Sequence, residues 1–129
     1  MTPELTALTL AALLQVVHFA IYSVTAQIQV GTKYAASPRD TPRTLTGIAG
    51  RAQRAMNNHF EGLILFAIAA LTLTYADKAD EFTAIASALY LIARVLYLPA
   101  YLLGLAPWRS LIWFIGFLAT TFLLIKALL

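Results

Sequence analysis

Cysteine is absent from this chain of 129 residues, and charged side chains make up only 12% of it. Without cysteine the chain forms no disulfide bond, and any thiol chemistry must use a thiol that a ligand brings. With so few charges and 60% hydrophobic residues, the composition lies outside the range of an ordinary soluble domain. The sequence therefore predicts a protein whose main solvent is the lipid bilayer.

Several signatures of soluble enzymes are also missing. There is no glycine-rich phosphate loop, no Gly-x-Ser-x-Gly elbow and no pair of carboxylates placed for hydrolysis. His18 has no metal ligand at a suitable spacing and His59 stands alone, so no metal site is expected. His18 is interpreted as a hydrogen-bonded residue of the bundle or of a subunit contact. The net charge of +3 comes without the aromatic and basic pattern that indicates nucleic-acid binding.

Four long apolar stretches remain. A helix needs about 20 such residues to cross the hydrocarbon of a bilayer, so the chain is predicted to be all-α, a membrane four-helix bundle forming one domain over residues 1–129. No lysine or arginine precedes Lys33, so the first stretch lacks the basic segment of a signal peptide and is expected to stay in the mature protein. The predicted helices are Leu5 to Val30, Ala55 to Tyr75, Phe82 to Leu103 and Trp108 to Leu129.

The charges between the stretches predict the orientation of the chain. The first connection carries five basic residues against one acid, Asp40, and the last connection carries Arg109, whereas the middle one, ADKADE, is net acidic. Because basic loops stay in the cytoplasm, both termini are expected on the other side of a bacterial inner membrane. The net positive charge is then an orientation signal that also contacts lipid headgroups. The five basic residues are Lys33, Arg39, Arg43, Arg51 and Arg54.

Polar residues within the stretches identify the faces that point into the bundle, because a charge in hydrocarbon costs at least about 2.5 to 3.5 kcal/mol. Glu61 lies about 10 Å beyond Arg54 along its helix, and Arg94 lies about 14 Å in from the same side. A buried ion pair between Glu61 and Arg94 is therefore predicted, with a structural rather than a catalytic role. The polar stripes are Gln15, His18, Tyr22, Thr25 and Gln29 in the first helix, Arg51, Arg54, Asn58 and Glu61 in the second, and Tyr90, Arg94, Tyr97 and Tyr101 in the third.

Nearer the basic side, the inward side chains offer many hydrogen-bond donors and few acceptors, which favours an anionic ligand. A second reading stays open, in which the arginines extend to lipid headgroups as topology signals. Tyr97 and Tyr101 also fit the aromatic belt of a membrane interface. The donor-rich residues are Arg51, Arg54, Asn58, Tyr101, Arg109 and Ser110.

The order and spacing of these residues resemble the MAPEG family, the membrane-associated proteins in eicosanoid and glutathione metabolism. The resemblance covers essentially the whole chain. The family's pattern of Arg, two residues, Arg, three residues, Asn, two residues and Glu matches within RAQRAMNNHFEGL. The third stretch contributes ARVLYLPAY and the fourth opens with PWRSL. The matching residues are Arg51, Arg54, Asn58, Glu61, Arg94, Tyr101, Arg109 and Ser110, and Asp40 matches an acid of the first loop.

The resemblance implies a homotrimer of four-helix bundles that holds glutathione, as a co-substrate, between neighbouring subunits. It implies a glutathione transferase or peroxidase acting on a lipophilic substrate that arrives from the bilayer. Arg109 and Ser110, which begin the last helix beside unpaired backbone donors, would hold the thiolate and form the catalytic pair. The residues implied to bind glutathione are Arg51, Arg54, Asn58, Glu61, Arg94, Tyr97 and Tyr101.

Three positions depart from the glutathione-using relatives. Gln29 and Trp113 stand where those relatives often have arginine and tyrosine, and Tyr97 stands where some have histidine. A non-catalytic lipid-binding or scaffold protein on the same fold is therefore the main alternative. A small multidrug transporter subunit with a proton-coupled Glu61 is disfavoured, because Arg94 is expected at the same depth.

Overall fold

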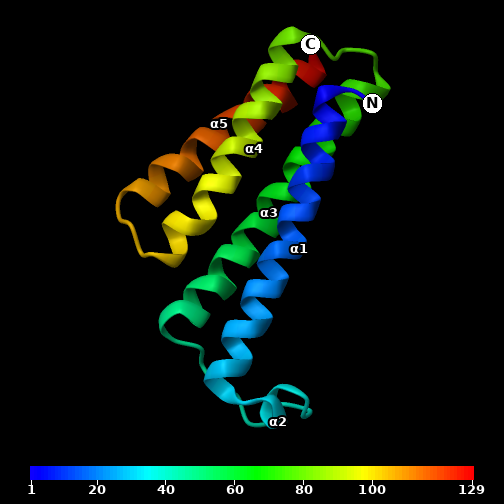
Figure 1. The fold of residues 1–129 in the computed structure, drawn as a ribbon. Helices are drawn as coiled ribbons and strands as arrows, with labels where there is room; N and C mark the ends of the chain where they lie inside the picture. Colours follow the sequence, from blue (N-terminus) through cyan, green and yellow to red (C-terminus); the bar gives the residue numbers. More distant parts are fainter.

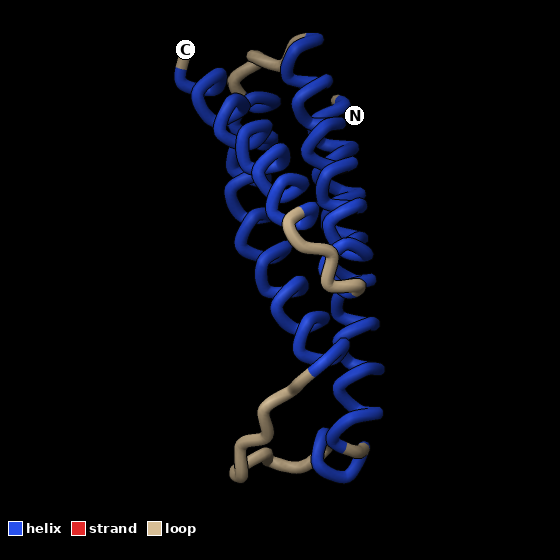
Figure 2. Tube along the Cα trace, turned by 90° about the vertical axis from the view of Figure 1, so that its left-hand side faces the viewer, coloured by secondary structure: helices blue, strands red, loops and turns tan.

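The computed structural model describes all 129 residues, as helices and connecting loops without a strand. Four helices are long: α1 (Pro3–Val30), α3 (Gly47–Tyr75), α4 (Glu81–Leu102) and α5 (Trp108–Leu128); the single turn α2 (Thr32–Ala35) lies in the first loop. Successive long helices reverse direction, with α1 beside α3 and α4 beside α5 (Figure 1). Both termini lie at one end of the bundle, here called the termini end, and α2 lies at the other, the loop end (Figure 2).

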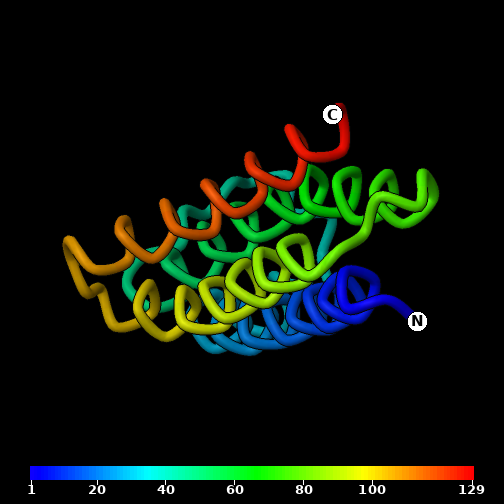
Figure 3. The backbone as a smooth tube through the Cα atoms, turned by 90° about the horizontal axis from the view of Figure 1, so that it is seen from above, coloured from blue at the N-terminus to red at the C-terminus, as the bar shows by residue number.

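All four long helices have the length and apolar composition needed to cross a membrane. Only 28 of the 129 residues are buried, and large hydrophobic side chains such as Phe19, Ile68 and Phe114 point outward. Viewed from above, the helices form one bundle with no further layer to cover these side chains (Figure 3). Lipid tails are the solvent that suits such a surface, and the chain is an integral, multi-pass membrane protein.

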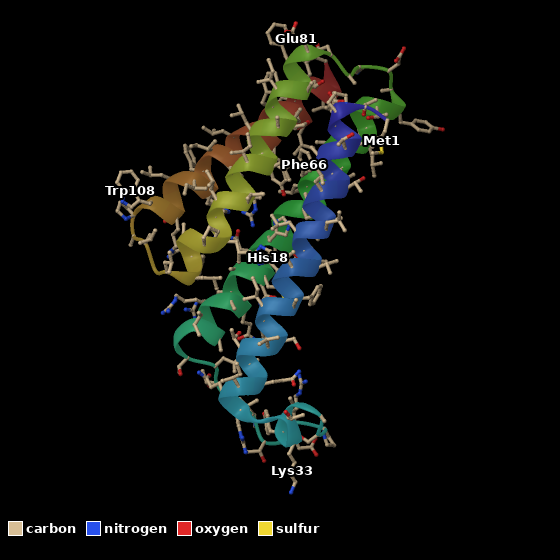
Figure 4. All side chains as sticks on the ribbon, in the orientation of Figure 1. Met1, His18, Lys33, Phe66, Glu81 and Trp108 are labelled. Atoms are coloured by element: carbon tan, nitrogen blue, oxygen red, sulfur yellow. The ribbon has the colours of Figure 1, made fainter.

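Small side chains fill much of the bundle interior, which lets neighbouring helices approach closely. Inside the bundle, Phe66 of α3, which Figure 4 labels, stacks on Tyr90 of α4 with ring centroids 4.0 Å apart. Below this stack, toward the loop end, the interior becomes polar. The main core cluster is Ala7, Ala11, Phe66, Ala69, Ala70, Leu73, Ala86, Tyr90, Ala119 and Leu123.

Polar contacts close the bundle at the termini end. Asp80 caps α4 by accepting the backbone N–H of Thr83 at 2.9 Å, and it forms an ion pair of 2.9 Å with Lys126 of α5. The Thr83 N–H and the Lys126 ammonium hold the pKa of the Asp80 carboxyl below its usual value. The Thr83 hydroxyl donates to the buried carboxylate of Glu4. These contacts tie α1, α4 and α5 together.

Three of the four predicted helices are confirmed to within two residues at each end. The predicted start of the second helix at Ala55 is wrong, because α3 begins at Gly47. Hydropathy detects only the part of a helix that lies in hydrocarbon. The first turns of α3, with the sequence GIAGRAQR, contain two arginines and lie outside that part. As a result α1 and α3 extend past the α4–α5 turn at the loop end (Figure 1).

Candidate functional site

Arg94 is the most deeply buried cation of the protein, with 3% of its surface exposed. Its two terminal nitrogens both donate to the side-chain oxygen of Asn58 at 3.0 Å, and its Nε donates to Nδ1 of His59 at 3.1 Å. The predicted ion pair with Glu61 is wrong, since the only salt bridge in the structure joins Lys126 to Asp80. The guanidinium bonds Asn58 and His59 in place of Glu61, which is exposed on the side of α3.

The hydrogen bonds of His59 determine which of its ring nitrogens carries the proton and which accepts from Arg94. Its Nε2 lies 2.8 Å from the carbonyl oxygen of Ala11, to which it can only donate, so Nδ1 is free to accept from Arg94. The ring of His18 stacks on His59 at 4.8 Å, yet neither nitrogen of His18 has a hydrogen-bond partner. His18 is therefore a buried residue of the bundle, as expected, but it makes no hydrogen bond within this subunit. No three His, Cys, Asp or Glu side chains gather in a way that could hold a metal ion.

A cavity of about 170 Å³ opens beside Arg94 between α3, α4 and α5. Each terminal nitrogen of Arg94 carries two hydrogens and uses one of them for Asn58, so two N–H groups remain available. The hydroxyl of Tyr90 is buried there without a partner, and Glu61 contributes a carboxylate to the same wall. The lining residues are Asn58, Glu61, Gly62, Leu65, Tyr90, Arg94, Trp113, Gly116, Phe117 and Thr120.

A row of guanidinium groups and tyrosine rings leads from this cavity toward the loop end. The Arg94 guanidinium lies 4.6 Å from the ring centre of Tyr97, whose ring meets that of Tyr101 edge to face at 5.5 Å. The Tyr101 hydroxyl accepts from Nε of Arg54 at 3.1 Å, and the Arg109 guanidinium lies 4.6 Å from the Tyr101 ring centre. None of these arginines pairs with a carboxylate. No carboxylate of the chain neutralises the positive charge of the row, so the row suits an anionic ligand.

Arg51, Arg109 and Ser110 offer fewer free hydrogen-bond donors to a ligand than the sequence predicts. Nε of Arg51 donates to the carbonyl oxygen of Leu102 at 2.8 Å and so caps the end of α4. The backbone N–H groups of Arg109 and Ser110 donate at 3.0 Å to the carbonyl oxygens of Leu105 and Pro107, so the expected free backbone donors are not found at these two residues. Only the side chains of Arg109 and Ser110 remain available there.

Two of the three departures from the family pattern, Gln29 and Trp113, make contacts that the structure shows. Gln29 bonds both backbone groups of Thr46, donating to its oxygen at 3.0 Å and accepting from its nitrogen at 2.8 Å. It thereby fastens the end of α1 to the start of α3. Trp113 stacks on Phe117 at 5.2 Å and forms part of the wall opposite Arg94.

The functional residue that the sequence pattern does not reveal is His59, which lies off the polar stripe of its helix. Its signal is the spacing of three and four residues that it shares with small and apolar residues of the same helix, which marks the inward face. The buried members of that face are Ala52, Ala55, Met56, His59, Phe66, Ala69, Ala70 and Leu73.

Comparison with known proteins agrees with this architecture. No curated protein matches the chain. The model of the MAPEG family matches residues 5–129, which is nearly the whole chain. The chain belongs to the MAPEG family.

Proposed function

We propose that this protein binds glutathione along the row from Arg94 to Arg109 and uses its thiol to conjugate or reduce lipophilic substrates. The observation that carries the proposal is the row itself: three arginines, stacked on or bonded to tyrosines, that have no carboxylate partner within the chain. Membership of the MAPEG family supports the same assignment. Glutathione, when bound, supplies a thiolate nucleophile for attack on an electrophile or a peroxide.

The charges of the site fit the charges of glutathione. The tripeptide has two carboxylates and one ammonium group, and the site offers unpaired guanidinium groups along its length with one unpaired carboxylate, Glu61, near its deep end. Arg94 and Glu61 line the same cavity and suit the carboxylate and ammonium of the γ-glutamyl end. Arg54 and the amide of Asn58 would then position the middle of the ligand through charge-assisted hydrogen bonds.

Arg109 and Ser110 are the groups that we assign to the thiol. Arg109 is half-buried and stacked on Tyr101, so its charge is held near the mouth of the row. Ser110 is exposed beside it, with a hydroxyl free to donate. A lipophilic substrate would reach this point from the bilayer, since the apolar side chains of α5 border it on the outside.

Calorimetric titration with glutathione in detergent tests the proposal. We expect saturable binding to the wild type, unchanged binding to Lys33→Gln, which removes one distant exposed charge, and at least about tenfold weaker binding to Arg54→Gln. A wild type that gives no saturable heat at millimolar glutathione would refute the proposal. It would favour the alternative of a lipid-binding or scaffold protein, to which Gln29, engaged with Thr46, and Trp113, stacked on Phe117, already lend some support.

We also propose that the protein is a homotrimer in a bacterial inner membrane, with the basic loop end in the cytoplasm and the termini outside. Family membership and the charge of the first loop support this. The polar stripe of α1 adds little support for a trimer, because Gln15 and His18 are buried within a single subunit. Native mass spectrometry in mild detergent should find three copies per particle, and particles of only one or two copies would exclude the trimer.

A further inference from the structure

A second cavity, of about 370 Å³, lies at the loop end and shares no residue with the cavity beside Arg94. Its walls come from the last turns of α1, from α2 and the loop that follows, and from a single residue of α3. No acidic residue lines it, although two arginines do. The lining residues are Tyr22, Ser23, Ala26, Gln27, Val30, Thr32, Tyr34, Ala35, Ala36, Arg39, Arg43, Leu45 and Gln53.

The two arginines are held by neutral groups. Arg43 donates to the carbonyl oxygen of Val30 at 3.0 Å, and its guanidinium stacks over the Tyr34 ring at 4.2 Å. Arg39 donates through Nε and one terminal nitrogen to the carbonyl oxygen of Ala35, at 3.0 and 2.6 Å. Neither forms a salt bridge. Each guanidinium has five N–H donors, so both are fixed in place while most of their donors and all of their charge remain available.

The depth of the cavity follows from contacts along the bundle. Arg51 bonds the carbonyl oxygen of Leu102, so this part of α3 lies level with the end of α4, close to where α5 begins. Arg51 is eight residues, about 12 Å, from His59. The same step along the antiparallel α1 from His18, which stacks on His59, leads to Ala26 in the cavity wall. The cavity therefore straddles the boundary of the hydrocarbon, where the headgroup layer of a bilayer is roughly 5 to 7 Å thick.

We propose that this cavity binds the phosphate of an anionic membrane lipid. A guanidinium group matches a phosphate in charge and in geometry, since two N–H groups can bond two oxygens at once. The apolar part of the wall, formed by Ala26, Val30 and Leu45, suits the glycerol and the first methylenes of the lipid. The volume is within the range of sites that hold small molecules. Soluble phosphate esters offer the same charged group, so the test must separate the two sources.

Thermal unfolding of the delipidated full-length protein in detergent provides the test. Added phosphatidylglycerol should raise the Tm of the wild type by a few degrees, because a ligand that binds only the folded state stabilises it. Phosphatidylcholine should give a much smaller rise. Arg39→Gln and Arg43→Gln should each lose most of the response to phosphatidylglycerol. Lys33→Gln is the matched control, because it removes one charge from the same loop at a residue outside the cavity.

The outcomes are distinct. If Lys33→Gln loses the response as fully as the arginine variants do, only the net charge matters and the proposal fails. An equal rise with phosphatidylcholine, or with glycerol phosphate and inorganic phosphate at millimolar concentration, would also overturn the assignment to an anionic lipid. Should an arginine variant not fold, native mass spectrometry of the wild type decides: a retained phosphatidylglycerol in preference to phosphatidylcholine supports the site, and equal retention contradicts it.

Discussion

Replacing Arg109 with leucine is expected to lower glutathione-dependent turnover by about 10²- to 10³-fold, while glutathione still binds. The thiol of glutathione has a reference pKa of about 8.5, and each unit of depression takes about 1.4 kcal/mol of preferential stabilisation of the thiolate. Arg109 is the cation nearest the start of α5, and its guanidinium is fixed against Tyr101 at 4.6 Å. Because the backbone N–H groups of Arg109 and Ser110 are already used, the guanidinium must supply most of that stabilisation.

The measurement is the absorbance of the bound thiolate against pH, at saturating glutathione, for the wild type and Arg109→Leu. The variant should titrate at a higher pH, since it lacks the cation that favours the charged form. Tyr101→Phe is the matched control: it keeps the ring beneath Arg109 but loses the hydroxyl that bonds Arg54. It should weaken glutathione binding and leave the thiol titration in place. Coinciding titrations for the wild type and Arg109→Leu would show that Arg109 only orients the chain or contacts headgroups.

Much of the fold follows from the sequence because hydropathy, charge and helical spacing are local properties. The ends of α1, α4 and α5 are set by the change from apolar residues to Pro, Gly and charged residues, so they could be predicted closely. The start of α3 could not, since a helix that leaves the bilayer keeps its backbone hydrogen bonds in water. The turn α2 has no periodic pattern and depends on bonds such as that from Tyr34 to the Thr41 carbonyl.

The candidate site shows a second limit. Counting residues along the helices placed Glu61 and Arg94 at one depth, and both do line the same cavity. Depth does not fix the direction in which a side chain points around the helix axis, however. Asn58 and His59 point more directly at Arg94, and they accept three of its five N–H donors without a carboxylate. The spacing of Tyr97 and Tyr101 places them on one stripe, but their edge-to-face contact could not be predicted, because aromatic stacking between successive turns depends on side-chain rotamers.

The same contacts reverse an expectation about stability. A structural ion pair would make Glu61→Gln destabilising, but Glu61 is exposed and has no cationic partner, so this substitution should change the free energy of unfolding by less than about 0.5 kcal/mol. Asn58→Leu should instead cost about 3 kcal/mol. It removes the acceptor of two hydrogen bonds from a buried guanidinium, and a bond to a charged group contributes about 1.5 to 3 kcal/mol.

Reversible unfolding in mixed micelles with increasing dodecyl sulfate would measure both changes, and Asn57→Leu supplies the matched control. Asn57 is exposed and makes no side-chain hydrogen bond, so the same change of residue type there should be nearly neutral. Asn58→Asp should retain most of the stability, since a carboxylate offers Arg94 an acceptor in the same position. If Glu61→Gln proves as costly as Asn58→Leu, the Glu61 carboxylate must reach Arg94 once the protein is in a membrane. The deep end of the site would then be an ion pair, and the two free N–H groups assigned to the γ-glutamyl carboxylate would already be occupied.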